Sequence, residues 1–133
     1  MRSSLKDQPT PDRLLKAVAD PIRLRILTML GDDDACVCQI VAVFSLAQSA
    51  VSRHLRILRD AGLIVDRPRG RWTFYRLARA RPGSEAGRLL ALVRESPALR
   101  RQSAADRRAL RSGRIRDLLL TCPPPPRRGP RGD

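Results

Sequence analysis

The sequence contains one histidine and three cysteines, and this scarcity limits the chemistry that the chain can perform. One histidine supplies no plausible pairing of a nucleophile with a base, and no glycine-rich loop is placed to cradle a phosphate. Three irregularly spaced cysteines are also too few for a disulfide framework. The sequence therefore predicts a binding protein and not an enzyme.

Long apolar runs are absent as well. The N-terminal residues have no apolar stretch of the kind found in signal peptides, and no run is long enough to span a bilayer. We therefore expect a cytoplasmic protein with no membrane partner. The reducing cytosol should keep its cysteines as free thiols.

Acidic residues are outnumbered, and the formal net charge is +14. Residues 1–97 contribute +7 and residues 98–133 contribute the other +7, so the basic character is not confined to one end. A charge of this size favours a polyanionic partner, usually nucleic acid. A basic surface without a partner is the plainer interpretation, and the charge alone does not separate the two.

Capping signals and apolar spacing predict a mainly α-helical fold with one β-hairpin. Thr10-Pro11 and Asp20-Pro21 each place a capping side chain before a proline, which is typical of helix starts. Gly31 should end the second helix. Further expected elements are a short helix over 37–43, a longer helix after Ser45-Leu46-Ala47 that ends at Ala61-Gly62, strands over 64–67 and 72–77, and a helix over 84–95.

The expected organisation has four parts. Residues 1–9 form a disordered arm, and residues 10–96 form a winged helix-turn-helix domain for DNA binding and dimerisation. Residues 97–121 are rich in helix formers and form a C-terminal helical extension. The Pro- and Arg-rich residues 122–133 form a disordered tail.

The longer helix has the two faces that a recognition helix needs. Val51, Leu55 and Leu58 should face the core, while small and polar residues lie opposite. The expected DNA contacts come from this helix and from the tip of the hairpin: Gln48, Ser49, Ser52, Arg53, His54, Arg56, Arg69 and Arg71. A solvated amphipathic helix explains the spacing equally well, but the cationic hairpin favours DNA binding.

Three stretches resemble the ArsR/SmtB family of metal-sensing repressors: residues 15–27, 51–63 and 70–77. The resemblance implies a homodimer that binds a palindromic operator and leaves it when an inducer binds, with no cofactor needed for DNA binding. It places the dimer interface on the helices over 11–19 and 84–95. The family often has Ser at the cap of its recognition helix, where this chain has Ala47, so Ser45 is a candidate cap.

Cys36-Val37-Cys38 begins the helix before the recognition helix, where the arsenite-sensing branch of this family has a similar pair. Thiolates select soft ions, and a helix N-terminus favours the thiolate. We therefore expect Cys36 and Cys38 to bind As(III) or Sb(III), with Cys122 as a candidate third ligand. The family's zinc-type and cadmium-type sites are excluded, because His54 is the single histidine and residues 1–35 contain no cysteine.

Two other functions remain open. Cys36 or Cys38 could instead be oxidised, which would make the chain a thiol redox regulator on the same fold. The basic chain could also bind DNA without any inducer.

Overall fold

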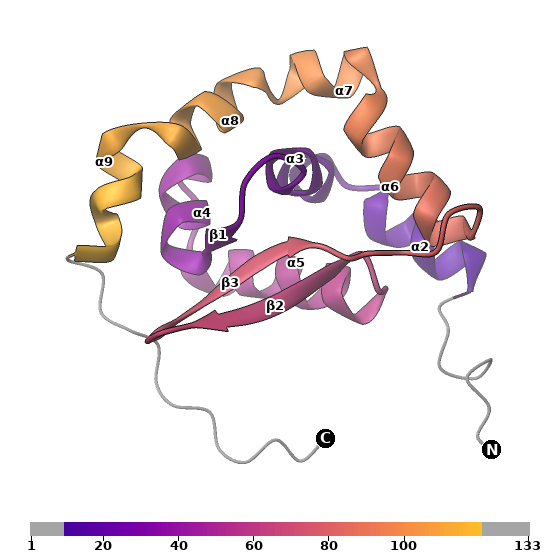
Figure 1. Cartoon of the computed structure of the whole chain (residues 1–133), viewed down its shortest axis with the longest axis horizontal. Helices are drawn as coiled ribbons and strands as arrows, with labels where there is room; N and C mark the ends of the chain where they lie inside the picture. Colours follow the sequence, from indigo (N-terminus) through magenta and orange to yellow (C-terminus); the bar gives the residue numbers. More distant parts are fainter. Residues whose placement is uncertain (1–9, 121–133) are drawn as a thin grey trace.

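The computed structural model describes residues 10–120, and the predicted arm (residues 1–9) and tail (residues 122–133) lie outside this range. The described part is mainly helical, with a small sheet (Figure 1). Its helices are α2 (Pro11–Val18), α3 (Pro21–Leu30), α4 (Val37–Phe44), α5 (Gln48–Asp60), α6 (Glu85–Glu95), α7 (Pro97–Gln102), α8 (Ala104–Arg111), α9 (Gly113–Arg116) and the 3-10 turn η1 (Asp117–Leu120). The predicted helical fold with a hairpin is confirmed.

Several helix boundaries have the causes expected from the sequence. The Asp20 carboxylate accepts hydrogen bonds from the backbone N–H groups of Ile22 and Arg23, at 2.9 and 3.1 Å, and so caps α3. Pro21 occupies the first turn of that helix, and Gly31 follows its last residue. The Ser84 side chain caps α6 by accepting from the N–H of Gly87.

The hairpin consists of β2 (Ile64–Arg69) and β3 (Trp72–Leu77), and a short strand β1 (Ala35–Cys36) joins it. The strand order is β1-β3-β2, and both pairings are antiparallel. In the register, Cys36 lies opposite Phe74 and Arg69 lies opposite Trp72. Strand β1 was not predicted. It ties the segment before α4 directly to the hairpin.

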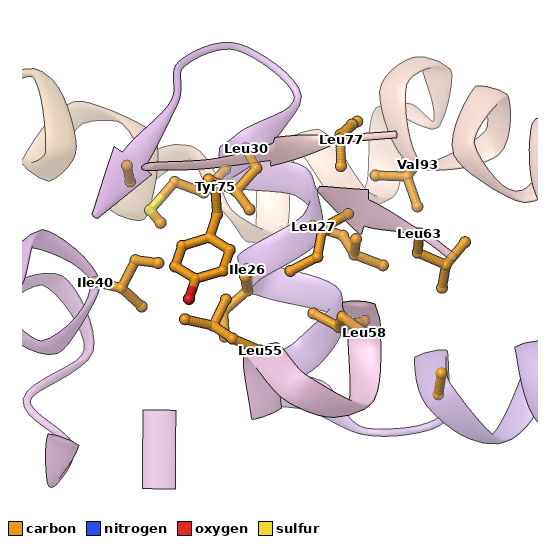
Figure 2. Packing of buried hydrophobic residues seen from close by; sticks show 14 of the residues in the cluster. Ile26, Leu27, Leu30, Ile40, Leu55, Leu58, Leu63, Tyr75, Leu77 and Val93 are labelled. Carbon is orange, nitrogen blue, oxygen red and sulfur yellow. The ribbon is translucent and has the colours of Figure 1, made fainter. Parts of the chain in front are cut away.

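Helix α3 passes through the centre of the molecule, where α2, α5, α6, α7, α8 and β3 all contact it (Figure 1). Ile26 and Leu27 of α3 are fully buried. Figure 2 shows the Tyr75 ring of β3 among Ile26, Ile40 and Leu55, so side chains from the sheet and three helices meet in one core. This core holds α5 by its apolar side, which leaves the opposite side of the helix exposed.

Helices α7, α8 and α9 curve over α3 and α4 at the side of the molecule away from the hairpin (Figure 1). Leu110 of α8 and Ile115 of α9 are buried in the same hydrophobic cluster as Ile26 and Leu55. The extension therefore packs on the core through buried side chains. None of the helices in residues 10–120 is long and apolar enough to cross a membrane.

Candidate DNA interface and thiol site

Helices α4 and α5 pack against each other, and residues 45–47 form the turn between them. Ser45 lies in the left-handed region, with φ 55°, and ends α4. The expectation that Ser45 caps the next helix is therefore wrong. Ala47 is the N-cap residue of α5, and it supplies no side-chain hydrogen bond.

The outward face of α5 is polar and exposed. Val51, Leu55 and Leu58 are buried, as the spacing predicted. The predicted contact residues exposed along the helix are Gln48, Ser49, Ser52, Arg53 and Arg56. These side chains therefore lie on one accessible surface, whose small serines permit close approach to a groove.

His54 lies apart from this surface. Only 9% of the residue is exposed, and Arg23 Nη1 lies 3.1 Å from its Nδ1. A guanidinium can only donate, so Nδ1 accepts. Burial lowers the pKa of His54, and the nearby Arg23 and Arg53 lower it further against the opposing effect of Asp20. The structure places His54 where it secures α5 to α3.

Strand β2 of the hairpin contacts α5, and the hairpin ends in a basic tip (Figure 1). Arg67, Arg69 and Arg71 are all exposed. Arg69 Nη2 lies 3.2 Å from Asp34 Oδ2, and its guanidinium lies 4.6 Å from the centre of the Phe74 ring. Arg69 is thus held over the strand, whereas Arg71 follows the turn at Gly70, where φ is 63°.

Cys36 is enclosed by the fold. It is 2% exposed, is the free cysteine among the described residues, and lies in β1 at the cap of α4. Its backbone N–H donates to Gln39 Oε1 at 3.1 Å. Burial raises the pKa of the Cys36 thiol, although the backbone N–H groups of Gln39 and Cys38 act in the opposite direction. The expectation that the helix N-terminus favours its thiolate is wrong, because burial outweighs it.

Cys38 lies in the first turn of α4 and is disulfide-bonded. The expectation that every cysteine is a free thiol is therefore wrong for Cys38. Cys122, the proposed third metalloid ligand, lies outside the described residues. Within residues 10–120, no group of three or more His, Cys, Asp or Glu side chains could hold a metal ion.

The structure brings together charged residues that sequence reasoning missed. Arg25 of α3 pairs with Asp106 of α8, and Asp32 in the loop after α3 pairs with arginines of the extension, namely Arg100, Arg107 and Arg111. The paired residues are 68 to 81 positions apart along the chain. No local pattern could have signalled these pairs.

Comparison with known proteins assigns the chain to a family. Residues 20–65 match the family described as "Bacterial regulatory protein, arsR family". The arsenic resistance transcriptional regulator ArsR1 of Pseudomonas putida is 39% identical over 69 residues, and the arsenical resistance operon repressor of Escherichia coli is 41% identical over 69 residues. Each match covers 51% of this chain, but only 54% and 59% of the two relatives, respectively.

Solved structures extend the similarity beyond the matched segment. HlyU from Vibrio cholerae N16961 superimposes with a TM-score of 0.55 at 32% identity, covering 78% of this chain and 99% of that chain. A structure titled as reduced HlyU from the same source has a TM-score of 0.52 at 37% identity, covering 61% of this chain and 81% of that chain. The fold is thus a winged helix-turn-helix, and the chain belongs to the ArsR family of bacterial regulatory proteins.

Proposed function

We propose that this chain is a dimeric transcriptional repressor that binds operator DNA and is released through thiol chemistry at Cys38. The observation that carries DNA binding is the exposed polar face of α5, together with the basic tip of the hairpin whose strand β2 contacts that helix. In this proposal α5 enters the major groove. Gln48 and Arg53 contact base edges, and Arg69 and Arg71 hold the phosphates alongside.

The dimer is proposed from two exposed leucines. Leu15 of α2 is 58% exposed and Leu92 of α6 is 57% exposed, and both helices pack on α3. Figure 1 draws α2 and α6 at the same end of the molecule. A second copy covering this end would bury both leucines and generate a two-fold axis suited to a palindromic operator.

The thiol switch rests on the different states of the two cysteines. Cys36 is buried with a raised pKa, so it is a poor nucleophile, whereas Cys38 is partly exposed and disulfide-bonded. With a peroxide as oxidant, the Cys38 thiolate would attack one oxygen and release water after proton transfer, which leaves a sulfenic acid. A second thiol would then form the S–S bond and release a second water.

Helix α4 supplies the route from Cys38 to DNA, because it packs directly against α5. A change in its first turn would shift the recognition helix, and the two helices of a dimer must match half-sites about one helical turn apart. A coupling free energy of about 3 kcal/mol is enough to change operator affinity more than a hundredfold. We propose that the reduced form binds and the disulfide form leaves.

The test begins with duplex DNA that the reduced wild-type chain selects from a random-sequence library. Affinity is then measured for reduced and peroxide-treated protein by fluorescence anisotropy. Cys38→Ser should bind in both conditions, while Cys36→Ser should still be released by peroxide. Cys122→Ser tests the remaining cysteine, and peptide mapping identifies the residue joined to Cys38. Equal affinity of reduced and oxidised wild type would refute the redox switch.

A second candidate inducer is As(III) or Sb(III), bound by Cys36 and Cys38 with Cys122 as a possible third ligand. The names of the Pseudomonas putida and Escherichia coli relatives favour it. The burial of Cys36 opposes it, because ligation would require that residue to leave its capping position. Titrating the DNA-bound reduced protein with arsenite distinguishes the two inducers. If arsenite releases the wild type from DNA but neither Cys36→Ser nor Cys38→Ser, the result supports the metalloid.

Binding without an inducer is the remaining outcome of the same experiments. It predicts that neither peroxide nor arsenite changes the affinity of the wild-type chain for the selected duplex. Failure to select any duplex would refute operator binding itself, whatever the thiols do.

A further inference from the structure

We infer that Asp106, in the C-terminal extension, is a positioning residue for DNA recognition, because it holds Arg25 against Phe44 at the entrance to the recognition helix. The inference rests on the proposed operator binding and adds residues remote from the exposed face of α5. It assigns the extension a role in setting the angle of the helix-turn-helix.

The first contact joins α8 to α3. Arg25 Nε donates to Asp106 Oδ2 at 2.9 Å, and Arg25 Nη2 donates to Asp106 Oδ1 at 2.8 Å. Asp106 is buried, and the hydrogen bond that it accepts raises the pKa of Arg25 above its ordinary value. Two parallel hydrogen bonds between planar groups fix the orientation of the guanidinium as well as its position.

The second contact joins the same guanidinium to the end of α4. The Arg25 Cζ atom lies 4.7 Å from the centre of the Phe44 ring, within the range of a cation–π interaction. Phe44 is the last residue of α4, and Ser45 follows it in the left-handed conformation. One side chain thus connects the extension to the turn that leads into α5.

The start of α5 has little local support of its own. Its N-cap residue is Ala47, which makes no side-chain hydrogen bond to the exposed N–H groups of the first turn. The core packing of its apolar side holds the body of α5, so the preceding turn matters most for the position of its first turn. Arg25 and Phe44 supply that support, and α8 also packs on α4 directly.

Asp106→Asn is the most informative variant, because the change in charge and the loss of positioning predict opposite changes in affinity for DNA. Replacing a carboxylate by an amide raises the net charge by one, which on electrostatic grounds strengthens binding to DNA. The amide can accept from Arg25 but cannot form two parallel acceptor bonds, so the guanidinium loses its fixed orientation. Positioning therefore predicts weaker operator binding, by about fivefold or more.

The connection from Asp106 through Arg25 to Phe44 is called the relay below. Two further variants test it without changing Asp106. Arg25→Lys keeps the charge but loses the planar fork and the stacking group. Phe44→Leu keeps an apolar side chain of similar size but removes the ring. The matched control is Arg111→Gln, which breaks the 2.7 Å contact between α8 and Asp33 but changes none of Asp106, Arg25 and Phe44.

Affinity for the duplex selected by the wild-type chain, affinity for a scrambled duplex and urea unfolding are measured for each variant. We expect each of the three relay variants to lose selected-duplex affinity with little change on scrambled DNA. The Asp106→Asn/Phe44→Leu double variant should bind the selected duplex no more weakly than the single variant with the lower affinity. Both substitutions break the same connection from Asp106 through Arg25 to Phe44, so their effects should not add. Arg111→Gln lowers the net charge by one, so it should weaken binding to the two duplexes by a similar factor and leave the ratio of the two affinities at the wild-type value.

Unchanged or tighter selected-duplex binding by folded Asp106→Asn would overturn the inference, as would full additivity in the double variant. If Asp106→Asn does not fold, the other two variants decide. The inference is then overturned if Arg25→Lys and Phe44→Leu bind the selected duplex with the affinity of the wild type. A wild-type chain that selects no duplex refutes the proposed function and the relay with it. If the wild-type chain selects a duplex and the variants bind that duplex equally well, the relay is refuted but the proposed operator binding is not.

Discussion

The guanidinium of Arg23 donates from Nη1 to Nδ1 of His54 across 3.1 Å, which joins α3 to the inner side of α5. The same guanidinium donates from Nε to the carbonyl of Ala17 at 2.6 Å, so α2 is included in the contact. Because the ring must accept at Nδ1, the contact requires neutral His54. Protonation would remove the acceptor and place two cations together.

This contact predicts a loss of stability in mild acid. The pKa of His54 is lowered in the folded state from its ordinary value of 6.5, so below that value the unfolded chain binds more protons. The free energy of unfolding should therefore fall as the pH drops through this region and stop falling below the folded-state pKa. One proton contributes at most about 1.4 kcal/mol per pH unit.

Urea unfolding at about pH 7.5 and about pH 5.5 tests this, with His54→Asn as the control. The Asn amide oxygen can accept from Arg23 but does not titrate in this range. The wild type should lose more stability than the variant between the two conditions. An equal loss in both proteins would show that other groups cause the acid sensitivity.

Arg71 should contribute to DNA affinity without reading sequence, because it is exposed at the hairpin tip. Arg71→Ala should weaken binding to selected and scrambled duplexes by a similar factor and reduce the salt slope by about one unit. Anisotropy titrations at several salt concentrations measure both quantities. Arg114→Ala, an exposed change on α9, is the control; a specific loss on the selected duplex alone would contradict the phosphate role.

Leu15 and Leu92 should hold the dimer together. Both are exposed within one chain, so Leu15→Glu and Leu92→Glu should leave the subunit fold intact but bury a carboxylate in the proposed interface. Light scattering at micromolar concentration should report a monomer mass for each variant and a dimer mass for the wild type. Arg101→Glu places the same carboxylate on exposed α7 and should remain dimeric; dimeric leucine variants would place the interface elsewhere.

Replacing Gly87 and Gly113 by alanine should change the stability of the fold in opposite directions. A Cβ at Gly87 would lie 2.3 Å from the carbonyl oxygen of Arg81, so Gly87→Ala must displace backbone and should cost about 1–3 kcal/mol. A Cβ at Gly113 would meet nothing within 4 Å at the start of α9. Gly113→Ala should stabilise the chain by about 0.4–1 kcal/mol. Chemical denaturation compares them, and equal effects would contradict the packing around Gly87.

Much of the fold was predictable because its signals are local. Asp20-Pro21 and Gly31 bracket α3 within a few residues, and the spacing of Val51, Leu55 and Leu58 identifies the buried side of α5. The inward position of His54 was also within reach. It follows Val51 by three residues and precedes Leu58 by four, so it lies on the same side of the helix.

The remaining features depend on contacts between distant parts of the chain. Strand β1 has two residues and no periodicity, and it exists because Ala35 and Cys36 pair with Tyr75 and Phe74. That pairing buries Cys36, and burial raises the pKa of its thiol, whereas a position at the start of a helix was expected to lower it. The contact between Arg25 and Asp106 spans 81 positions, and neither side chain is distinctive in its own segment.

The Asp32–Asp34 loop has a kinetic consequence. Asp32 and Asp33 pair with arginines of the extension and so offset part of its positive charge, whereas Asp34 pairs with Arg69 of the hairpin. Arg53, Arg56 and Arg71 are exposed around the recognition surface instead. The molecule should then carry an electric dipole that turns α5 toward DNA before contact, so that association is oriented as well as fast at low ionic strength.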